Sequence, residues 1–342
     1  MQRKTNKQTN NIMKMKKELL ASLTSAALFG SVANAEIPLT DDLSAYGYID
    51  MALTDADGDG TENSTSSSVA EFELGFAFTP AESKWSAVAE VSFDSNSDST
   101  TTRGNGLDDT PGTADDTFST ETNSSAEFET VTISYAASDE LSFTAGNILS
   151  YQGFETYDAT GLYQFSYAGS TINDGSGVLY SAGYAVGACV DYVTEDYALG
   201  AWIGDSDDAK QSFEFLAAFT AVEDLTVKLI YADDPNYETV NMWASYNLGD
   251  FTFAAEYVDT EYEPGEGTDL EAFVFLAYYS FGKAGLTLRY TDAEYGNVDF
   301  EKFTISPSYA FSDNVFGLLE FSTEELGDQD HESFAAELIY SF

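Results

Sequence analysis

The chain ends with SFAAELIYSF, which runs from Ser333 to Phe342. In an extended strand, successive side chains alternate between two faces. One face here is apolar and aromatic, and it consists of Phe334, Ala336, Leu338, Tyr340 and Phe342. The other face is mostly small or polar, and no helical pattern nearby would cover the apolar one. Such a strand is stable when its apolar face meets lipid and both its edges are paired, as in a closed transmembrane barrel.

The composition favours many strands joined by polar loops. The 342 residues include 25 Phe and 22 Tyr but only 6 Pro, and Gly, Ser, Thr, Asn and Asp fill the breaks between apolar runs. After residue 35 the sequence shows neither helical periodicity nor an alternation of strands and helices. It contains no run of 18 apolar residues, so it predicts no membrane-spanning helix. We therefore predict an all-β fold, a closed antiparallel transmembrane barrel.

The chain is strongly acidic, with a net charge of −46. Residues 36–342 hold seven basic residues against 58 acidic ones, a net charge of −51. Nucleic acid is not expected as a partner, because binding its phosphates needs a basic surface. Cations are the natural counterparts, although the acidity equally fits a salt-adapted surface that only stays hydrated. The single cysteine, Cys189, and the single histidine, His331, exclude an intrachain disulfide, cysteine-based metal sites and most imidazole chemistry.

Residues 1–35 read as a secretory signal peptide. Lys14, Lys16 and Lys17 form a positive segment, the apolar stretch 19–32 follows, and Ala33-Asn34-Ala35 fits the small-residue cleavage motif. The alternative is a short amphipathic helix. We expect residues 1–35 to be removed after transport through the inner membrane, and residues 36–342 to form the barrel.

Sixteen segments with a period of two follow the signal peptide. They cover residues 43–54, 68–79, 84–94, 126–136, 141–147, 185–193, 197–203, 212–220, 225–232, 239–248, 251–260, 270–281, 285–291, 300–311 and 315–322 and the terminal strand. Every second connection has two to four residues, and the others run from about six to more than thirty, including a polar loop at 95–125. Short periplasmic turns that alternate with long outer loops are typical of bacterial barrels. A β-solenoid would need repeats of even length, which these loops do not allow.

Two of these segments resist assignment to an inner and an outer face. Residues 270–281 are apolar on both faces. In 126–136, Glu127 and Glu129 share a face with Val131 and Ile133.

A signal peptide, repeated strands and a terminal Phe342 together resemble the Gram-negative outer-membrane β-barrel proteins. The stretch from Gly146 to Ala168 is similar to the OmpL-like family of outer-membrane porins, in its Gly146, its Gly153-Phe154-Glu155 and its Phe165-Ser166-Tyr167. This resemblance implies a cell outer-membrane location among lipid and lipopolysaccharide, and passive diffusion of small hydrophilic solutes. It also implies a homo-trimer, and recognition of Phe342 by the barrel assembly machinery.

The loop at 148–181 is rich in aromatic residues and poor in charge. We predict that it folds into the lumen and narrows it, because so many rings would not remain in water. The constriction residues would then be Tyr151, Phe154, Glu155, Tyr157 and Asp158. An external cap or an oligomer contact are the alternative roles.

Sixteen strands enclose an aqueous lumen, and the polar face of each strand should line it. The main pore-lining candidates are Asp50, Glu71, Glu73, Glu90, Asp191, Glu214, Glu256, Arg289, Lys302 and Glu320. Alternation also turns Glu337, Lys84 and Lys228 inward. Because acidic side chains outnumber basic ones, this lumen should prefer cations. The alternative is that these side chains are merely solvated.

Asp55, Asp57 and Asp59 stand at alternate positions before Gly60, as in the first half of a calcium-binding loop. The glutamate expected at the twelfth position is replaced by Ser66, which excludes an EF-hand. We expect at most a loosely bound Ca²⁺ or Mg²⁺, with a solvated loop as the default, and no other cofactor.

The leading function is an outer-membrane porin, a passive channel that prefers cations. A structural or adhesive barrel with an occluded lumen is the alternative from another class. A barrel lipase would need a serine activated by histidine, for which His331 and Ser333 are the candidates. No third residue that would orient them is evident, so we do not expect an enzyme.

Overall fold

The computed structural model describes residues 36–58, 64–104, 117–155, 158–169, 172, 177–180, 183–205 and 210–342. The predicted signal peptide, Asp59 and Tyr157 lie outside these residues.

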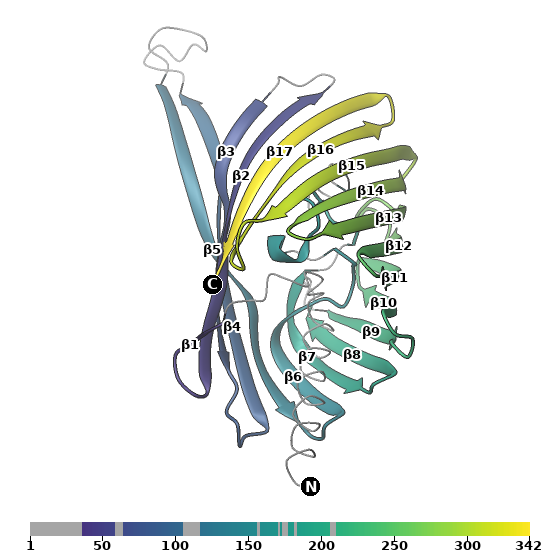
Figure 1. The fold of residues 1–342 in the computed structure, drawn as a ribbon. Coiled ribbons are helices and arrows are strands. Elements are labelled where there is room, and N and C mark those ends of the chain that lie inside the picture. The colour runs from purple at the N-terminus through teal and green to yellow at the C-terminus, as the bar shows by residue number, and fades with distance from the viewer. Residues whose placement is uncertain are drawn as a thin grey trace.

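Sixteen long strands form a closed antiparallel barrel, as predicted (Figure 1). Each strand from β2 to β16 pairs with the next, and β17 pairs with β2. A two-residue strand, β1, adds to β2 by pairing Ile37 with Ala45. The strands are β1 (Ile37–Pro38), β2 (Leu43–Gly58), β3 (Ser64–Phe78), β4 (Trp85–Gly104), β5 (Thr117–Ala136), β6 (Leu141–Leu149), β7 (Tyr184–Val193), β8 (Tyr197–Asp205), β9 (Gln211–Phe219), β10 (Leu225–Asp234), β11 (Tyr237–Leu248), β12 (Phe251–Tyr262), β13 (Leu270–Phe281), β14 (Ala284–Tyr295), β15 (Val298–Ala310), β16 (Val315–Leu326) and β17 (Gln329–Ser341).

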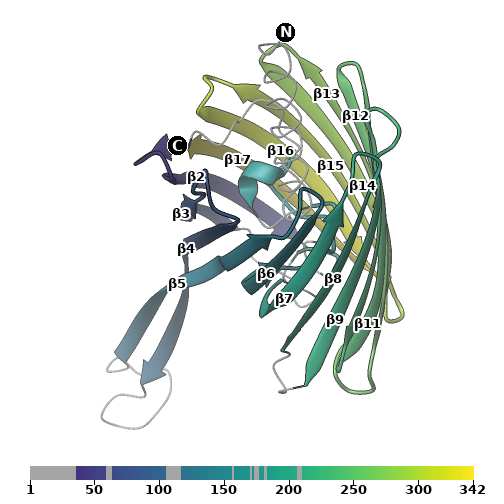
Figure 2. The ribbon, with the colours of Figure 1, turned by 90° about the horizontal axis from the view of Figure 1, so that it is seen from below.

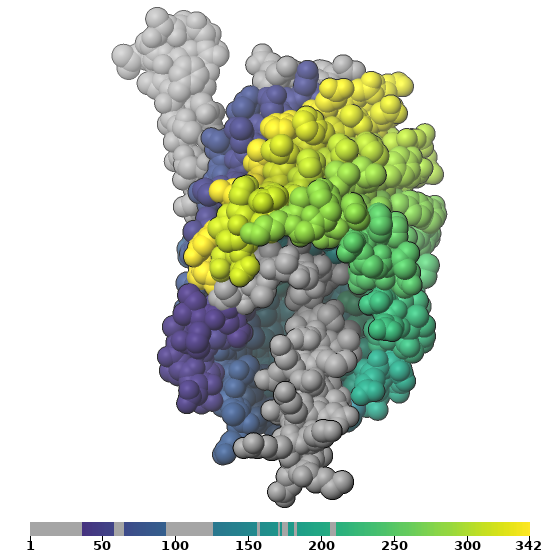
Figure 3. Space-filling model, in the orientation of Figure 1, coloured from purple at the N-terminus to yellow at the C-terminus, as the bar shows by residue number. Residues whose placement is uncertain are grey.

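The first and last long strands close the barrel at the C-terminus. The backbone N–H of Gly47 donates to the Phe342 carbonyl at 2.9 Å, and the N–H of Phe342 donates to the Gly47 carbonyl at the same distance. Figure 3 shows the purple N-terminal residues directly beside the yellow C-terminal ones. Closure leaves no free sheet edge, which a barrel in lipid requires.

The two faces of the wall differ as the alternation predicts. Large apolar side chains such as Phe275 and Phe321 are exposed on the outward face. Inward side chains are buried and mostly polar or small, for example Thr304 and Ser306 on β15. Within the described part of the chain, no helix is both long and apolar enough to cross a membrane.

A β-bulge explains why β5 resisted assignment. Ala89 of β4 pairs with Val131, whereas Val91 pairs with Phe128, so two residues of β5 stand opposite Glu90 alone. An extra residue reverses the alternation of side chains on either side of it. Phe128 and Val131 are therefore both exposed outside, while Glu129 is half-buried.

The strand β13 is apolar on both faces because its inner face does not meet water. Leu270, Ala272 and Val274 point inward and pack with Ala168 and Leu179, which belong to the long segment between β6 and β7. The outward face, with Phe273 and Phe275, is exposed.

Several strands are longer than the alternation predicts, and they gain these residues at the end of the barrel opposite the chain termini. The polar loop expected at 95–125 is largely a hairpin, in which Asp98 pairs with Asn123 and Gly104 with Thr117. This hairpin rises above the rest of the barrel in Figure 1. Ser and Thr residues form its strands without an apolar face, so the sequence there lacks the alternation that marks a strand.

Candidate functional site

The segment between β6 and β7, called here the inner segment, lies within the ring of strands (Figures 1 and 2) in its described residues, 150–155, 158–169, 172, 177–180 and 183. Its 3-10 helix η1 (Ala159–Gly161) stands inside that ring in both ribbon views (Figures 1 and 2). Tyr151, Phe154 and Tyr163 of this segment are buried, and they pack in one cluster with Trp202 and Trp243 of the barrel wall. The inner segment therefore has an apolar contact with one side of the lumen.

Inward carboxylates bind the backbone of the inner segment. Glu214 accepts from the Tyr151 N–H at 2.8 Å, and Glu256 accepts from the Phe154 N–H at 3.1 Å. Glu320 accepts from the N–H groups of Phe165 and Ser166 at 2.8 and 3.0 Å. Three of the predicted pore-lining residues thus support the inner segment rather than face open water.

Two tyrosines of the inner segment contact the barrel wall, one through its hydroxyl group and the other through its ring. The Tyr151 hydroxyl donates to Asp191 at 2.7 Å, and the Tyr163 ring lies 4.8 Å from the Tyr278 ring. Burial and the nearby Asp191 carboxylate raise the pKa of the Tyr151 hydroxyl, which keeps it a hydrogen-bond donor.

The basic side chains of the lumen contact carboxylates, aromatic rings and carbonyl groups. Arg289 Nη1 lies 2.5 Å from Glu155 Oε1, and its other nitrogen donates to the Tyr167 carbonyl at 3.0 Å. Lys302 Nζ lies 3.0 Å from Glu324, and Lys228 Nζ lies 4.8 Å from the ring centre of Trp243. The positive charges of Arg289 and Lys302 are therefore balanced locally by carboxylates.

The side of the lumen opposite the basic residues Arg289 and Lys302 is acidic. Glu71 and Glu73 of β3, Glu90 of β4 and Glu129 of β5 point inward there. Asp158, at the start of η1, faces this wall from the inner segment. Burial, and the carboxylates of Glu129, Glu90 and Glu71, raise the pKa of the Asp158 carboxyl well above its ordinary value. We call Glu71, Glu73, Glu90 and Glu129 the acidic wall.

The predicted pore-lining residues all lie on the inward face. Asp50, Glu73, Asp191, Glu214, Glu256, Arg289, Lys302 and Glu320 are buried, and Glu71 and Glu90 are half-buried. Their roles in permeation stay predictions. The expectation that Lys84 points inward is wrong, because Lys84 lies in the turn before β4 and donates to the Ala137 carbonyl at 2.9 Å. Sequence reasoning missed Glu129, which the bulge turns inward, and Glu324, which lies beyond the segment expected to be a strand.

Of the predicted constriction residues, Tyr151, Phe154 and Glu155 are buried in the lumen and Asp158 is half-buried. The predicted divalent-ion residues lie apart from this region. Asp55 is exposed on β2 and accepts a hydrogen bond from the Thr65 hydroxyl at 2.6 Å, and Asp57 is exposed opposite Glu332. That ion site stays a prediction.

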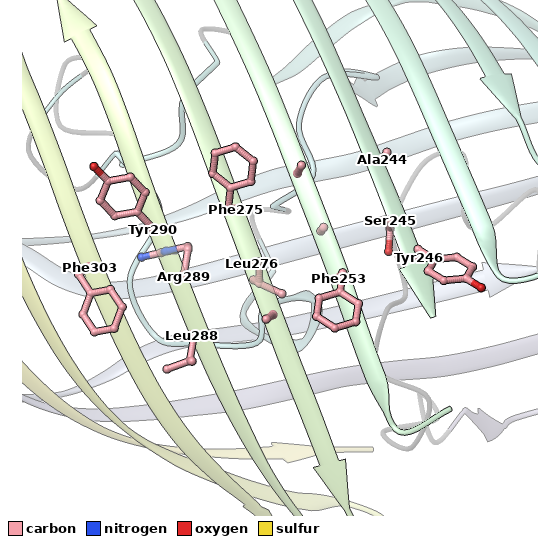
Figure 4. A pocket seen from close by; sticks show the side chains of 13 residues that line it. Ala244, Ser245, Tyr246, Phe253, Phe275, Leu276, Leu288, Arg289, Tyr290 and Phe303 are labelled. Carbon is pink, nitrogen blue, oxygen red and sulfur yellow. The ribbon is translucent and has the colours of Figure 1, made fainter. Parts of the chain in front are cut away.

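A groove of about 510 Å³ crosses the outward face of β11 to β15 (Figure 4). Its outward lining combines small and aromatic side chains: Ala244, Ala255, Ala277, Phe253, Phe275 and Tyr290. Because it faces away from the lumen, it is a lipid contact and no part of a channel. A smaller cavity of about 230 Å³ lies inside the barrel beside the inner segment, and Tyr184, Glu214 and Asp234 are among its lining residues.

Known proteins resemble this chain in sequence and in fold. A family model described as Gram-negative porin matches residues 22–323. Outer membrane protein U of Vibrio parahaemolyticus is 27% identical over 195 residues, which are 55% of this chain and 48% of that protein. The chain therefore spans about half the length of this curated relative.

Two solved structures share the architecture. The anion-selective porin from Comamonas acidovorans superposes with a TM-score of 0.60 at 14% identity, covering 88% of this chain and 99% of that one. The trimer form of OmpT from Vibrio cholerae, folded in vitro, has a TM-score of 0.57 at 13% identity, covering 88% of this chain and 99% of that one. At such identities the two structures establish the fold alone.

Proposed function

This chain belongs to the Gram-negative porin family, and on that premise we propose that it is a passive channel for small hydrophilic solutes that prefers cations. It is an outer-membrane protein, in agreement with its family, its relative and its barrel. Its family and fold point to a channel rather than an enzyme.

The distribution of charge in the lumen supports the cation preference. Arg289 and Lys302 are paired with Glu155 and Glu324, whereas the acidic wall presents several carboxylates close together on β3 to β5. A pore lined by an excess of one charge attracts the opposite ion and excludes its own. Cations passing the inner segment would therefore move along the acidic wall.

The fold itself does not decide the sign of the preference. The Comamonas acidovorans porin is anion-selective and shares this architecture. Side chains that line the lumen set the local potential, so the preference is argued from this chain's own carboxylates.

Conductance of the purified barrel in a planar bilayer under a tenfold KCl gradient tests both parts of the proposal. We expect discrete conductance steps and a reversal potential of the sign given by excess K⁺ flux. A reversal potential of zero or of opposite sign would overturn the cation preference, and the absence of steps would overturn the channel.

A structural barrel with an occluded lumen is the competing function. It is favoured by the apolar packing of Tyr151, Phe154 and Leu179 of the inner segment against the wall. The same bilayer measurement separates the two functions, because an occluded barrel inserts without conducting.

We do not expect hydrolase activity. The Ser333 hydroxyl lies 2.6 Å from the Ser322 hydroxyl, so its hydrogen-bond partner is another hydroxyl rather than an imidazole base. Replacing His331 should leave every measured property unchanged, and the loss of an esterase activity in that variant would contradict this expectation.

The partners follow from the same family membership. We propose a homo-trimer, which the trimer form of the Vibrio cholerae OmpT supports, and contact of the barrel with lipopolysaccharide and the assembly machinery in the outer membrane. Chemical cross-linking in outer-membrane fragments tests the trimer, and a product no larger than one chain would count against it.

A further inference from the structure

Three carboxylates of the acidic wall converge on one point. The side-chain oxygens of Glu71, Glu73 and Glu129 lie within 4.8 Å of one another. Glu71 and Glu73 are two residues apart on β3 and so share its inward face. Glu129 joins them because the β5 bulge turns its side chain to the same side. Three neighbouring negative charges repel one another unless a cation or protons lie between them.

Of these three carboxylates, that of Glu73 has the fewest interaction partners. Glu73 is only 5% exposed, and among the residues that the structure describes its carboxylate makes no hydrogen bond and no ion pair. Its neighbours differ, since the Tyr48 hydroxyl donates to Glu71 at 2.6 Å and the Tyr184 hydroxyl lies 3.4 Å from Glu129. A buried carboxylate without a partner is unfavourable, and binding a metal ion is one way in which proteins stabilise it.

The donor atoms select a hard cation. All three ligands are carboxylate oxygens, which suit Ca²⁺ and Mg²⁺, whereas zinc and copper sites use nitrogen or sulfur ligands. Calcium binds oxygens at about 2.3–2.6 Å in flexible geometry, whereas Mg²⁺ demands a nearly ideal octahedron at about 2.0–2.1 Å. Three wall carboxylates within 4.8 Å of one another can share one Ca²⁺ ion, which tolerates an irregular set of ligands better than Mg²⁺ does.

We propose that Glu71, Glu73 and Glu129 bind a Ca²⁺ ion in the lumen wall. The proposal deepens the cation preference and rests on the proposed function, because the ion reaches this site through an open lumen. The site differs from the exposed Asp55 and Asp57 on β2.

Occupancy of the site would regulate the channel. Asp158 of the inner segment faces Glu71 and Glu129, so a bound Ca²⁺ lies between the wall and the start of η1. Two positive charges there reduce the negative potential of the acidic wall. Ca²⁺ should therefore lower the preference for K⁺ and the conductance in KCl.

Terbium luminescence tests the site directly. Tb³⁺ replaces Ca²⁺ at oxygen sites, and the rings of Tyr46, Tyr48 and Tyr184 lie close enough to excite it, because their hydroxyls contact Glu90, Glu71 and Glu129. In the detergent-solubilised full barrel, freed of divalent ions, we expect saturable Tb³⁺ luminescence that Ca²⁺ displaces. Glu73→Gln and Glu129→Gln should each weaken binding at least tenfold.

Glu301→Gln is the matched control, because it removes the same charge from an exposed, outward-facing position on β15, away from the acidic wall. It should bind Tb³⁺ like the parent protein. The proposal is overturned if Glu73→Gln and Glu129→Gln also bind like the parent, if no saturable luminescence arises, or if all three variants lose binding alike. Far-UV circular dichroism and heat-modifiable gel mobility establish that each variant is folded.

Channel measurements in EDTA keep this proposal separate from the proposed function. If the barrel inserts but does not conduct in EDTA, the channel fails while Tb³⁺ binding still reports on the site. If it conducts in EDTA and Ca²⁺ changes the parent and Glu73→Gln equally, the regulatory site fails and the channel stands.

Discussion

The Arg289 guanidinium and the Glu155 carboxylate form a fully buried ion pair that joins β14 to the inner segment, with Nη1 and Oε1 2.5 Å apart. Glu155 also accepts from the Gln164 amide and from the Ala168 N–H, both at 2.8 Å. One carboxylate thus connects two parts of the inner segment to each other and to the wall.

Replacing Arg289 by methionine should destabilise the barrel and loosen the inner segment. The substitution keeps the aliphatic bulk but leaves Glu155 buried without its cation, which costs about 3–5 kcal/mol in the free energy of unfolding. Urea unfolding in lipid vesicles, followed by tryptophan fluorescence, measures the loss. Single-channel records should show larger current noise.

The double variant Arg289→Met, Glu155→Gln is the control for this prediction, because it removes both charges and leaves no ion unpaired. It should recover most of the stability that the single variant loses. Equal stability of the parent and Arg289→Met would mean that this ion pair does not hold the inner segment.

Glu90→Gln should reduce the cation preference without closing the channel. Glu90 is half-buried in the acidic wall and accepts from the Tyr46 hydroxyl at 2.5 Å, which an amide oxygen can still accept. In a tenfold KCl gradient the limit for perfect selectivity is about 59 mV. We expect the reversal potential to move towards zero, and Glu90→Lys to move it further.

The exposed Glu301 provides the matched comparison for this charge change. Glu301→Gln alters the net charge equally, but Glu301 lies on the outward face of β15, between the inward Phe300 and Lys302. If it shifts the reversal potential as much as Glu90→Gln does, the overall charge of the barrel rather than its lumen sets the preference.

Much of the fold could be predicted from alternation alone, because lipid on one side and a polar lumen on the other impose a period of two on each strand. The side of the wall on which Glu129 lies could not be predicted, because nothing in the sequence marks the extra residue in β5. The two apolar faces of β13 became clear only with the inner segment in place, because Val274 packs against residues far away in the sequence. Local patterns do not contain such tertiary contacts.

The same limit applies to the lumen carboxylates. The alternation correctly turns Glu214, Glu256 and Glu320 inward, but it cannot separate carboxylates that bind backbone N–H groups from those that face ions. Only the position of the inner segment makes that distinction. It leaves the acidic wall as the part of the lumen where carboxylates are concentrated.

With lipid on the outer face, a lysine should be tolerated at one position of β10 and destabilising at the next. Lys228 points inward and is buried over the Trp243 ring, whereas Leu229 is 49% exposed on the outward face. Leu229→Lys should cost about 2–4 kcal/mol in unfolding from vesicles, because a charge near the bilayer midplane loses its water. Gln211→Lys, at the exposed end of β9, should cost about 0–1 kcal/mol. Similar losses for both variants would contradict a lipid-facing Leu229.

The end of the chain combines closure of the barrel with the proposed recognition by the assembly machinery, and two variants separate these roles. Deleting Phe342 removes both backbone hydrogen bonds with Gly47, each worth about 0.5–1.5 kcal/mol, so refolded protein should lose about 1–3 kcal/mol. Phe342→Leu keeps both hydrogen bonds and removes only the ring, so its stability after refolding should stay close to that of the parent. In cells, however, the amount of folded Phe342→Leu protein in the outer membrane should fall, if the assembly machinery recognises the aromatic end as proposed. Normal assembly of Phe342→Leu together with poor assembly of the deletion would assign the effect to closure alone.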